Sequence, residues 1–353
     1  MNKWVKFGLG LAVTVGCMWW TFKDTLWTEM WAALTSANWL MLLPYFVLSV
    51  AVHLCRVVRW GNLLSGLEKV PFKKLNEASA IGFMMLIILP FRLGEFARPF
   101  LIAQRSSIRR SAAMTSVVLE RIVDGITMAV LLRVLVSFLP DDAPKIGAIR
   151  VAANVMFLVF SGGLSFLLLA RWQHDRVIGL MLKVLNPISP RLASRAVAIV
   201  DGFVGALRQL PDGRNMASFF FFTTLYWSLN GLGMLVFASG FDCSRTANAA
   251  CVPMSLTLFQ GFVVLGLLIV GMMVPAAPGS AGTFQSSVMI ALGVFFSLSV
   301  VNSTGVAFAN ALWVVQIVQQ IGFGLFFLAI SNTTFSDVTG NLRAGEKSEG
   351  GTA

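Results

Sequence analysis

The stretch IILPFRLGEFARP, residues 87–99, places three charged side chains within a strongly apolar segment. At the centre of a bilayer each such charge costs about 2.5 to 3.5 kcal/mol on insertion scales, so it needs a partner or a polar cavity. Arg92, Glu95 and Arg98 are spaced three residues apart, which places them in one row of alternating charge on a helix face. The two prolines and the glycine of this stretch predict that residues 76–104 form a broken helix.

The composition of the whole chain is that of a membrane protein. Of its 353 residues, 57% are hydrophobic and only 12% are charged, which is more apolar than a soluble globular domain. The apolar runs are continuous rather than alternating, which predicts membrane-spanning α-helices and excludes a β-barrel. The runs close to the length of a span are 4–22, 39–55, 111–139, 151–170, 218–239, 254–274 and 306–330.

The net charge of +11 is carried mainly by the short segments between the apolar runs. Basic loops stay on the cytoplasmic side of a membrane, and no nucleic-acid-binding motif is present. The basic blocks at 56–74 and 171–215 must therefore lie on the same side. One complete crossing by 76–104 would put them on opposite sides, whereas a segment that enters the membrane and returns would not. Re-entry is the preferred interpretation.

A second break, MMVPAAPGSAGTFQ at 272–285, also joins an apolar approach to prolines and glycines. It is approached from the opposite side of the membrane, as the interrupted segments of an inverted repeat are, and such segments place a site near the midplane. We therefore predict an all-α integral membrane protein with about six full transmembrane helices. Two broken or re-entrant helix hairpins, near 76–104 and 254–292, complete the expected fold.

The expected organisation is one polytopic membrane domain over 1–331, with a cytoplasmic amphipathic linker at 171–215. Residues 332–353 are expected to form a flexible cytoplasmic tail. This topology places both termini in the cytoplasm. Cys243 and Cys251 flank a short polar loop on the outer side, where they form either a disulfide or two free thiols.

A second polar cluster, LERIVDG at 119–125, lies within the span that begins near residue 111. Glu120 and Asp124 share a helix face, and Arg121 can contact Asp124 three residues away. Two interpretations are open, a self-neutralising structural ion network or a cavity whose arginines bind an anionic lipid headgroup through forked contacts. The candidate charged residues are Arg92, Glu95, Arg98, Glu120, Arg121 and Asp124.

Small and polar residues at the two breaks extend the candidate headgroup site. Gly94 would allow a ligand to approach the backbone, and the helix start after each break presents N–H groups suited to anions. The opposite wall would come from the second break. Alternatively, its small residues only allow close packing of helices. The candidates there are Gly279, Gly282, Thr283 and Gln285.

Other polar residues within the apolar runs have simpler interpretations. Arg56 and Arg59, with Trp60, are interpreted as an anchor at the inner membrane interface. The amides Asn230, Asn310, Gln316 and Gln320 are expected to form hydrogen bonds between helices. With two histidines and no C-x-x-C pair, no metal or other cofactor is expected, and no catalytic motif is present.

Three features of the chain resemble the lysylphosphatidylglycerol synthase transmembrane family, which is also called flippase-like. They are RVVRW at 56–60, PFRLGEFAR at 90–98 and ERIVD at 120–124, and the resemblance covers nearly the whole chain. The PGSAG break at 278–282 is similar to a fourth feature of the family. There the family usually has a glutamate where this chain has Gln285, which leaves a proton-coupling role at that position open.

The resemblance implies an inner-membrane protein of bacteria that moves phospholipid or lipid-linked sugar between leaflets. Some members also carry a soluble aminoacyltransferase domain, which this chain is expected to lack. The leading hypothesis is therefore a non-enzymatic flippase for an anionic phospholipid or lipid-linked sugar. The alternative is a non-transporting membrane subunit that binds a lipid-modifying enzyme through 171–215. A membrane-embedded sugar transferase is less well supported, and a homo-oligomer remains open.

Overall fold

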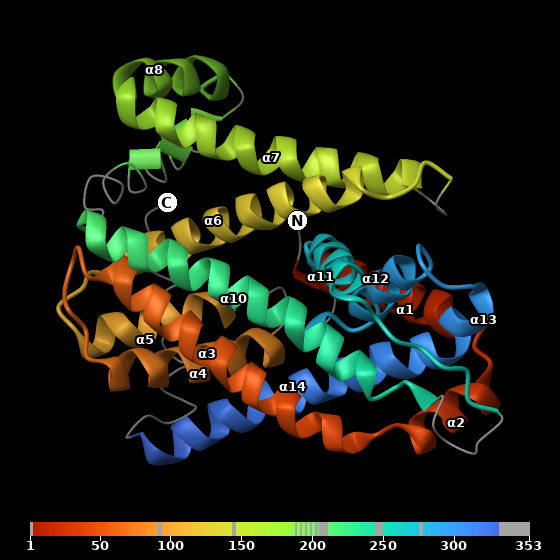
Figure 1. The fold of residues 1–353 in the computed structure, drawn as a ribbon. Helices are drawn as coiled ribbons and strands as arrows, with labels where there is room; N and C mark the ends of the chain where they lie inside the picture. Colours follow the sequence, from red (N-terminus) through yellow and green to blue (C-terminus); the bar gives the residue numbers. More distant parts are fainter. Residues whose placement is uncertain are drawn as a thin grey trace.

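The computed structural model describes residues 3–89, 94–142, 146–187, 211–243, 250–274 and 278–331, with a few positions between 189 and 204. Every regular element within these ranges is helical, and most of the helices lie roughly parallel to one another (Figure 1). In the first part of the chain the helices are α1 (Lys3–Phe22), α2 (Trp27–Ser36), α3 (Leu42–Leu64), α4 (Phe72–Ile88), α5 (Ala97–Arg105), α6 (Arg110–Ser137), α7 (Ile146–Trp172) and α8 (His174–Leu185). The remaining ones are α10 (Gly213–Ser239), α11 (Leu258–Met272), α12 (Thr283–Leu292), α13 (Leu298–Val300) and α14 (Val306–Ile330), with the short elements η1 (Trp39–Met41), η4 (Pro278–Ser280) and η5 (Val301–Gly305).

Four stretches of the described chain are long and apolar enough to cross a membrane, namely Trp39–Leu64, Ile146–Trp172, Gly213–Ser239 and Leu298–Ile330. Helix α6, with 28 residues, is also long enough to cross a membrane, but it is less apolar because it carries the charged cluster predicted at 119–125. The predicted all-α membrane fold is confirmed. The count of six crossings would need α1 and α6 as well, and it stays a prediction.

The segment 76–104 forms two antiparallel helices, as the prolines and glycine predict. Helix α4 ends at Ile88, α5 begins at Ala97, and the two pack against each other. Helix α5 has 9 residues, and at 1.5 Å per residue it rises only about 13 Å, less than half of a hydrocarbon core. A Cβ atom at Gly94 would overlap the backbone of α4 at Leu86, so only glycine lets the chain return so closely. Arg92, with the other residues of 90–93, lies outside the described residues.

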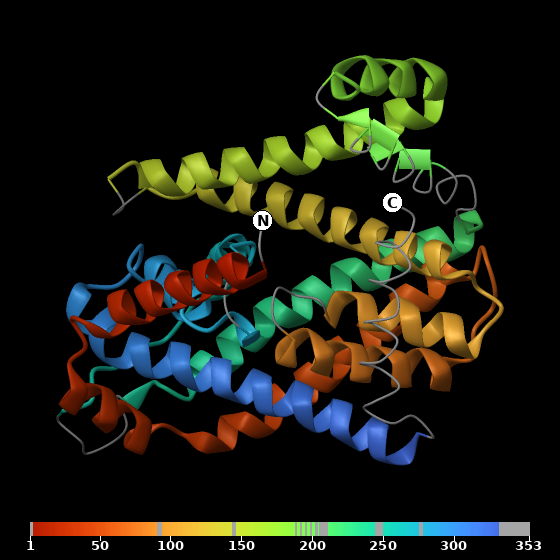
Figure 2. The same cartoon turned by 180° about the vertical axis from the view of Figure 1, so that it is seen from behind.

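The second hairpin consists of α11 and α12, which pack against each other, joined by a break that includes η4. Gly279 and Gly282 have φ angles of 69° and 82°, a left-handed conformation that glycine adopts without strain. The tip packs against α4, and a Cβ atom at Gly279 would lie 3.9 Å from Ile87 Cγ2. The end of α4 near Ile87 and η4 of the second hairpin therefore lie next to each other inside the bundle, and the two hairpins reach this point from opposite ends (Figures 1 and 2).

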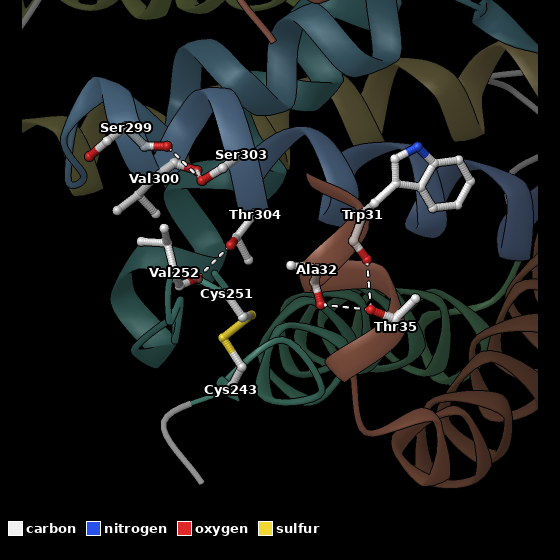
Figure 3. Close-up of a disulfide and its surroundings, with 10 residues drawn as sticks. All are labelled: Trp31, Ala32, Thr35, Cys243, Cys251, Val252, Ser299, Val300, Ser303 and Thr304. Atoms are coloured by element: carbon white, nitrogen blue, oxygen red, sulfur yellow. Dashed lines mark hydrogen bonds between the residues drawn. A yellow bond between two sulfur atoms is a disulfide. The ribbon is translucent and has the colours of Figure 1, made fainter. Parts of the chain in front are cut away.

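The two ends of the bundle differ in charge and chemistry. The α3–α4 loop, the α5–α6 loop, α8 and the start of α10 gather at the left end in Figure 1, so the described parts of both predicted basic blocks lie at the same end. The α6–α7 connection and the segment that carries Cys243 lie at the other end. Cys243 and Cys251 are joined by a disulfide, which resolves the alternative that the sequence left open (Figure 3). This arrangement agrees with the charge argument that favoured re-entry.

The 171–215 segment contains α8, which projects from the bundle in Figure 1. A small apolar cluster joins Ala170 at the end of α7 to Val200 and Val204, with Ile178 of α8 packed against it. Much of the amphipathic helix predicted around 192–210, like the tail 332–353, lies outside the described residues. The linker and tail assignments therefore stay predictions.

Candidate functional site

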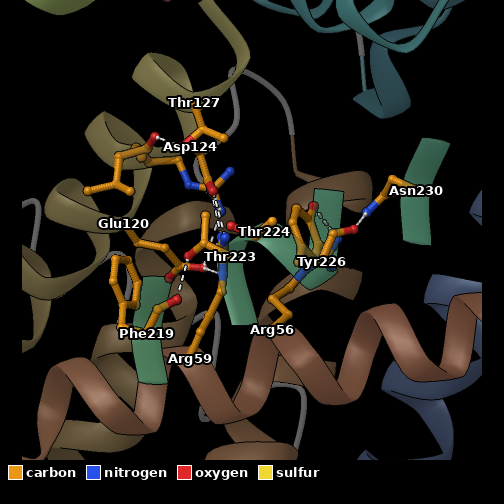
Figure 4. Close-up of polar contacts among 12 residues, drawn as sticks. Arg56, Arg59, Glu120, Asp124, Thr127, Phe219, Thr223, Thr224, Tyr226 and Asn230 are labelled. Carbon is orange, nitrogen blue, oxygen red and sulfur yellow. Dashed lines mark hydrogen bonds and ion pairs between the residues drawn. The ribbon is translucent and has the colours of Figure 1, made fainter. Parts of the chain in front are cut away.

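A buried arginine on α3 is the centre of the polar cluster. Arg59 has an exposed fraction of 0%, and its guanidinium donates to two carboxylates of α6 (Figure 4). Nη1 and Nη2 lie 2.6 Å from Asp124 Oδ1 and Oδ2, which is a bidentate fork. Nη2 and Nε also donate to Glu120 Oε1, at 2.6 and 3.1 Å. The interpretation of Arg59 as an interfacial anchor is wrong, because the i, i+4 spacing of Glu120 and Asp124 aims both carboxylates at it.

The second arginine of the cluster comes from the short helix of the first hairpin. Arg98 is 2% exposed, and its Nη1 donates to Glu120 Oε2 at 3.1 Å. Its guanidinium carbon lies 4.4 Å from the ring centroid of Trp60 and 4.6 Å from that of Phe83. Arg98 Nε and Nη2 are buried without a hydrogen-bond partner in the described part of the chain. Two strong donors are thus left for another acceptor.

Arg121 is held more loosely than these two. Its Nη2 lies 3.6 Å from Asp124 Oδ2 and 3.7 Å from Glu120 Oε1, and its side chain is 36% exposed. The contact predicted between Arg121 and Asp124 is therefore present as an ion pair, beyond hydrogen-bonding distance. The same carboxylates hold Arg59 much more closely, at 2.6 to 3.1 Å, so Arg121 is the more weakly paired of the two cations.

Arg56, one turn before Arg59, also faces the interior of the bundle. Its guanidinium carbon lies 3.8 Å from the centroid of the Phe83 ring, and Nη2 donates to Tyr226 Oη at 3.2 Å. The Tyr226 ring also lies 4.5 Å from the guanidinium carbon of Arg59. Aromatic faces take the place of water around these cations. The anchor interpretation fails for Arg56 as well.

The described cluster carries more positive than negative charge. Arg59, Arg98 and Arg121 pair with the two carboxylates of α6, and Arg56 lies beside them without a carboxylate contact among the described residues, so four positive charges stand against two negative ones, or three when Glu95 is included. The sequence had predicted near-neutrality, because it did not count the two arginines of α3. Arg59 and Arg98 are buried, whereas Arg56 and Arg121 are half-buried, and a surplus of positive charge at such a site is stabilised by an anion.

A small cavity brings together several of the predicted residues. Gly94, Glu95, Arg98 and Arg121 line it, with Gly82, Phe83, Leu86 and Val117. Its volume is about 10 Å³, which is close to the minimum for one water molecule and far too small for a lipid headgroup. Four of the predicted residues thus lie around one cavity, which is too small for a headgroup, and the headgroup site stays a prediction.

The residues predicted for the opposite wall are not among those that line this cavity. Gln285 is fully buried in α12, where its Oε1 accepts from the Gly282 N–H at 2.8 Å and its Nε2 donates to Asn310 at 3.4 Å. Thr283 Oγ1 donates to the carbonyl of Ser280 at 3.0 Å. Trp313 Nε1 donates to the Gly279 carbonyl at 2.8 Å. These contacts fix the break of the second hairpin against α14.

Broken hairpins that meet beside a buried, positively charged cluster define a polytopic α-helical membrane protein with a polar site inside the bundle. Residues 7–324 match the family model described as the lysylphosphatidylglycerol synthase TM region, and the chain belongs to this family. The family predicted from the sequence motifs is confirmed, and it associates the protein with lipid modification or transport. No curated protein and no solved structure shows significant similarity to the chain.

Proposed function

We propose that the protein moves an anionic phospholipid or lipid-linked sugar between the leaflets of a bacterial inner membrane. The observation that supports this most directly is Arg98, which is buried and has two N–H donors without a partner in the described chain. A phosphate group supplies several anionic acceptor oxygens, and guanidinium binds them in a forked geometry. The same group would offset the surplus positive charge of the cluster.

The carboxylates of α6 have a positioning role in this proposal. Glu120 binds Arg59 through one oxygen and Arg98 through the other, so it fixes the two guanidinium groups relative to each other. Asp124 accepts hydrogen bonds from Nη1 and Nη2 of Arg59. The donors of Arg98 are left for the headgroup, while the acyl chains stay in the bilayer.

A headgroup can bind only if the closed cavity opens. The cavity lies between the two arms of the first hairpin and α6, and Gly94 is in its wall. Because α5 is short and joined to α4 by a break, a shift of α5 away from α6 would enlarge the cavity without bending a full span. The tip of the second hairpin, at Gly279, packs on α4 and would respond to the same shift. In this proposal Gly279, Gly282, Thr283 and Gln285 form the second wall of the open state.

The experiment is leaflet exchange of a fluorescent phosphatidylglycerol in proteoliposomes. Arg98→Ala should abolish exchange while leaving the protein folded, because Glu120 retains its contacts with Arg59. Arg92→Ala should do the same if that residue completes the row predicted from the sequence. A matched control is Arg133→Ala, which removes an exposed arginine from the same helix as Glu120. Exchange by Arg98→Ala at the wild-type rate would reject the headgroup site.

The proposal assigns no chemical reaction to the chain. It also places the basic end of the bundle, with both termini, on the cytoplasmic side, following the positive-inside rule. If the purified wild-type protein does not exchange lipid but co-purifies with a lipid-modifying enzyme, the non-transporting subunit becomes the better explanation. Accessibility of cysteines introduced into α8 and into the α6–α7 loop, probed from each side of the membrane, tests the orientation.

A further inference from the structure

A second cavity, of about 100 Å³, lies among α3, α4, α10 and α14. Apart from Arg56, its polar lining consists of amides, two hydroxyl groups and an imidazole rather than acids. The polar residues, Arg56 excepted, are Ser49, His53, Asn230, Gln316, Gln319 and Gln320, with Tyr45 also in the wall. None of the described residues that line it is an aspartate or glutamate.

Two of the amides make no hydrogen bond within the described chain. Gln319 and Gln320 lie near the middle of α14, which spans Val306–Ile330 and belongs to a stretch that is long and apolar enough to cross a membrane. Asn310 on the same helix, by contrast, donates to the Val306 carbonyl at 2.9 Å and accepts from Gln285. Both side chains are half-buried, and because an amide in hydrocarbon without a partner costs free energy, a polar group in the cavity would stabilise them.

The amide cavity and the arginine cluster share a wall. Phe83 lines both cavities, and its ring lies between two cations, with Arg56 on the amide side at 3.8 Å and Arg98 on the cluster side at 4.6 Å from the centroid. Arg56 therefore stands where the two sites adjoin. A molecule whose phosphate reached the arginines would place the group attached to that phosphate among the amides.

We propose that the amide cavity binds the uncharged, hydroxyl-rich part of the headgroup, such as glycerol or a sugar, whose phosphate the arginine cluster binds. This inference rests on the proposed function and adds the class of substrate. Amides both donate and accept hydrogen bonds, which matches hydroxyl groups. An ammonium group is disfavoured, because Arg56 lies in the wall and no described carboxylate faces the cavity. The site thus selects phosphatidylglycerol or a phosphate-linked sugar over phosphatidylethanolamine and aminoacylated lipids.

The test is a competition for binding, measured by native mass spectrometry on the purified full chain. Equimolar phosphatidylglycerol, phosphatidic acid and phosphatidylethanolamine are offered, of which phosphatidic acid carries the phosphate without the polyol. The wild type should prefer phosphatidylglycerol over phosphatidic acid by about tenfold, as two neutral hydrogen bonds would provide. The double variant Gln319→Leu/Gln320→Leu should bring that ratio close to one. Val318→Leu, a lipid-facing change on the same helix, is the matched control and should leave it unchanged.

A variant that is expected to gain a new lipid preference cannot be explained by a loss of protein stability. Gln320→Glu adds a carboxylate of nearly the same shape to the cavity and should shift the preference toward phosphatidylethanolamine. Equal binding of phosphatidylglycerol and phosphatidic acid by the wild type, or an unchanged preference in both glutamine variants, would overturn the assignment. Arg98→Ala should weaken binding of both anionic lipids alike. If selectivity depends on the glutamines but no lipid is exchanged in proteoliposomes, the transport proposal fails and the polyol site stands.

Discussion

Replacing Arg59 by methionine should be among the most destabilising substitutions in the described chain. The side chain is fully buried and makes four contacts of 2.6 to 3.1 Å to two carboxylates. Removing one partner of a buried ion pair typically costs about 3 to 5 kcal/mol, because the remaining charge is left without compensation. Glu120 retains Arg98, whereas Asp124 retains only Arg121 at 3.6 Å. We therefore expect Arg59→Met to lower the free energy of unfolding by about 3 kcal/mol.

The assay is equilibrium unfolding in mixed SDS and dodecylmaltoside micelles, followed by tryptophan fluorescence. The indole of Trp60, adjacent to Arg59, donates to Ser116 Oγ at 3.0 Å, so its emission should respond when α3 separates from α6. Arg121→Met is the control and should cost less than about 1 kcal/mol, because its ion pairs are long and partly exposed. The double variant Arg59→Met/Asp124→Asn should recover part of the loss. A cost below about 1 kcal/mol for Arg59→Met, equal to that of the control, would show that the cluster does not stabilise the fold.

Three further predictions concern other parts of the molecule. Gly94→Ala should destabilise by about 1 to 3 kcal/mol, because its Cβ meets the backbone of Leu86, whereas Gly163→Ala on α7, with nothing near its Cβ, should have little effect in the same assay. Cys243→Ala/Cys251→Ala should cost about 2.5 kcal/mol from the entropy of the short closed loop, and a stability unchanged by the double substitution would contradict this. The hydrogen bonds with Asp201 and then Asp175 raise the pKa of His174 above its ordinary value of 6.5, so the contact with Asp201 is at full strength below about pH 6.5 and is lost as the pH rises through the raised value. Histidine NMR should find that Asp201→Asn moves this titration to lower pH, and an identical titration in the variant would rule out the contact.

Most of the fold could be predicted from the sequence, because the length of each apolar run predicts a membrane span and the basic residues predict on which side each loop lies. The runs that the sequence showed at 39–55, 151–170 and 306–330 appear as parts of α3, α7 and α14. The break within 76–104 followed from its two prolines and its glycine, and the return of the chain to the same side followed from the position of the basic residues. What composition alone did not predict is which helices pack together and therefore which face of each helix is buried.

The candidate site was predicted only in part, for the same reason. Glu120, Asp124 and Arg98 were found because charge within an apolar run is unusual and their spacing places them on helix faces. Arg59 was missed because an arginine near the end of a span is also typical of the interface. Its partners lie 61 and 65 residues further along the chain, so only tertiary packing identifies them. The available signal was Arg56 three residues earlier, which put two cations on one face of α3.

The pairing of Arg59 with α6 also has a consequence for how the protein is made. Arg59 is synthesised 61 residues before Glu120, which at 5 to 20 residues per second is a delay of about 3 to 12 s. During that interval the arginine lies one to two turns from the end of α3 at Leu64, and its long side chain can extend to the lipid headgroups. Until α6 has been made, Arg59 has neither of its two carboxylate partners, so the buried pairing can form only after both helices are present.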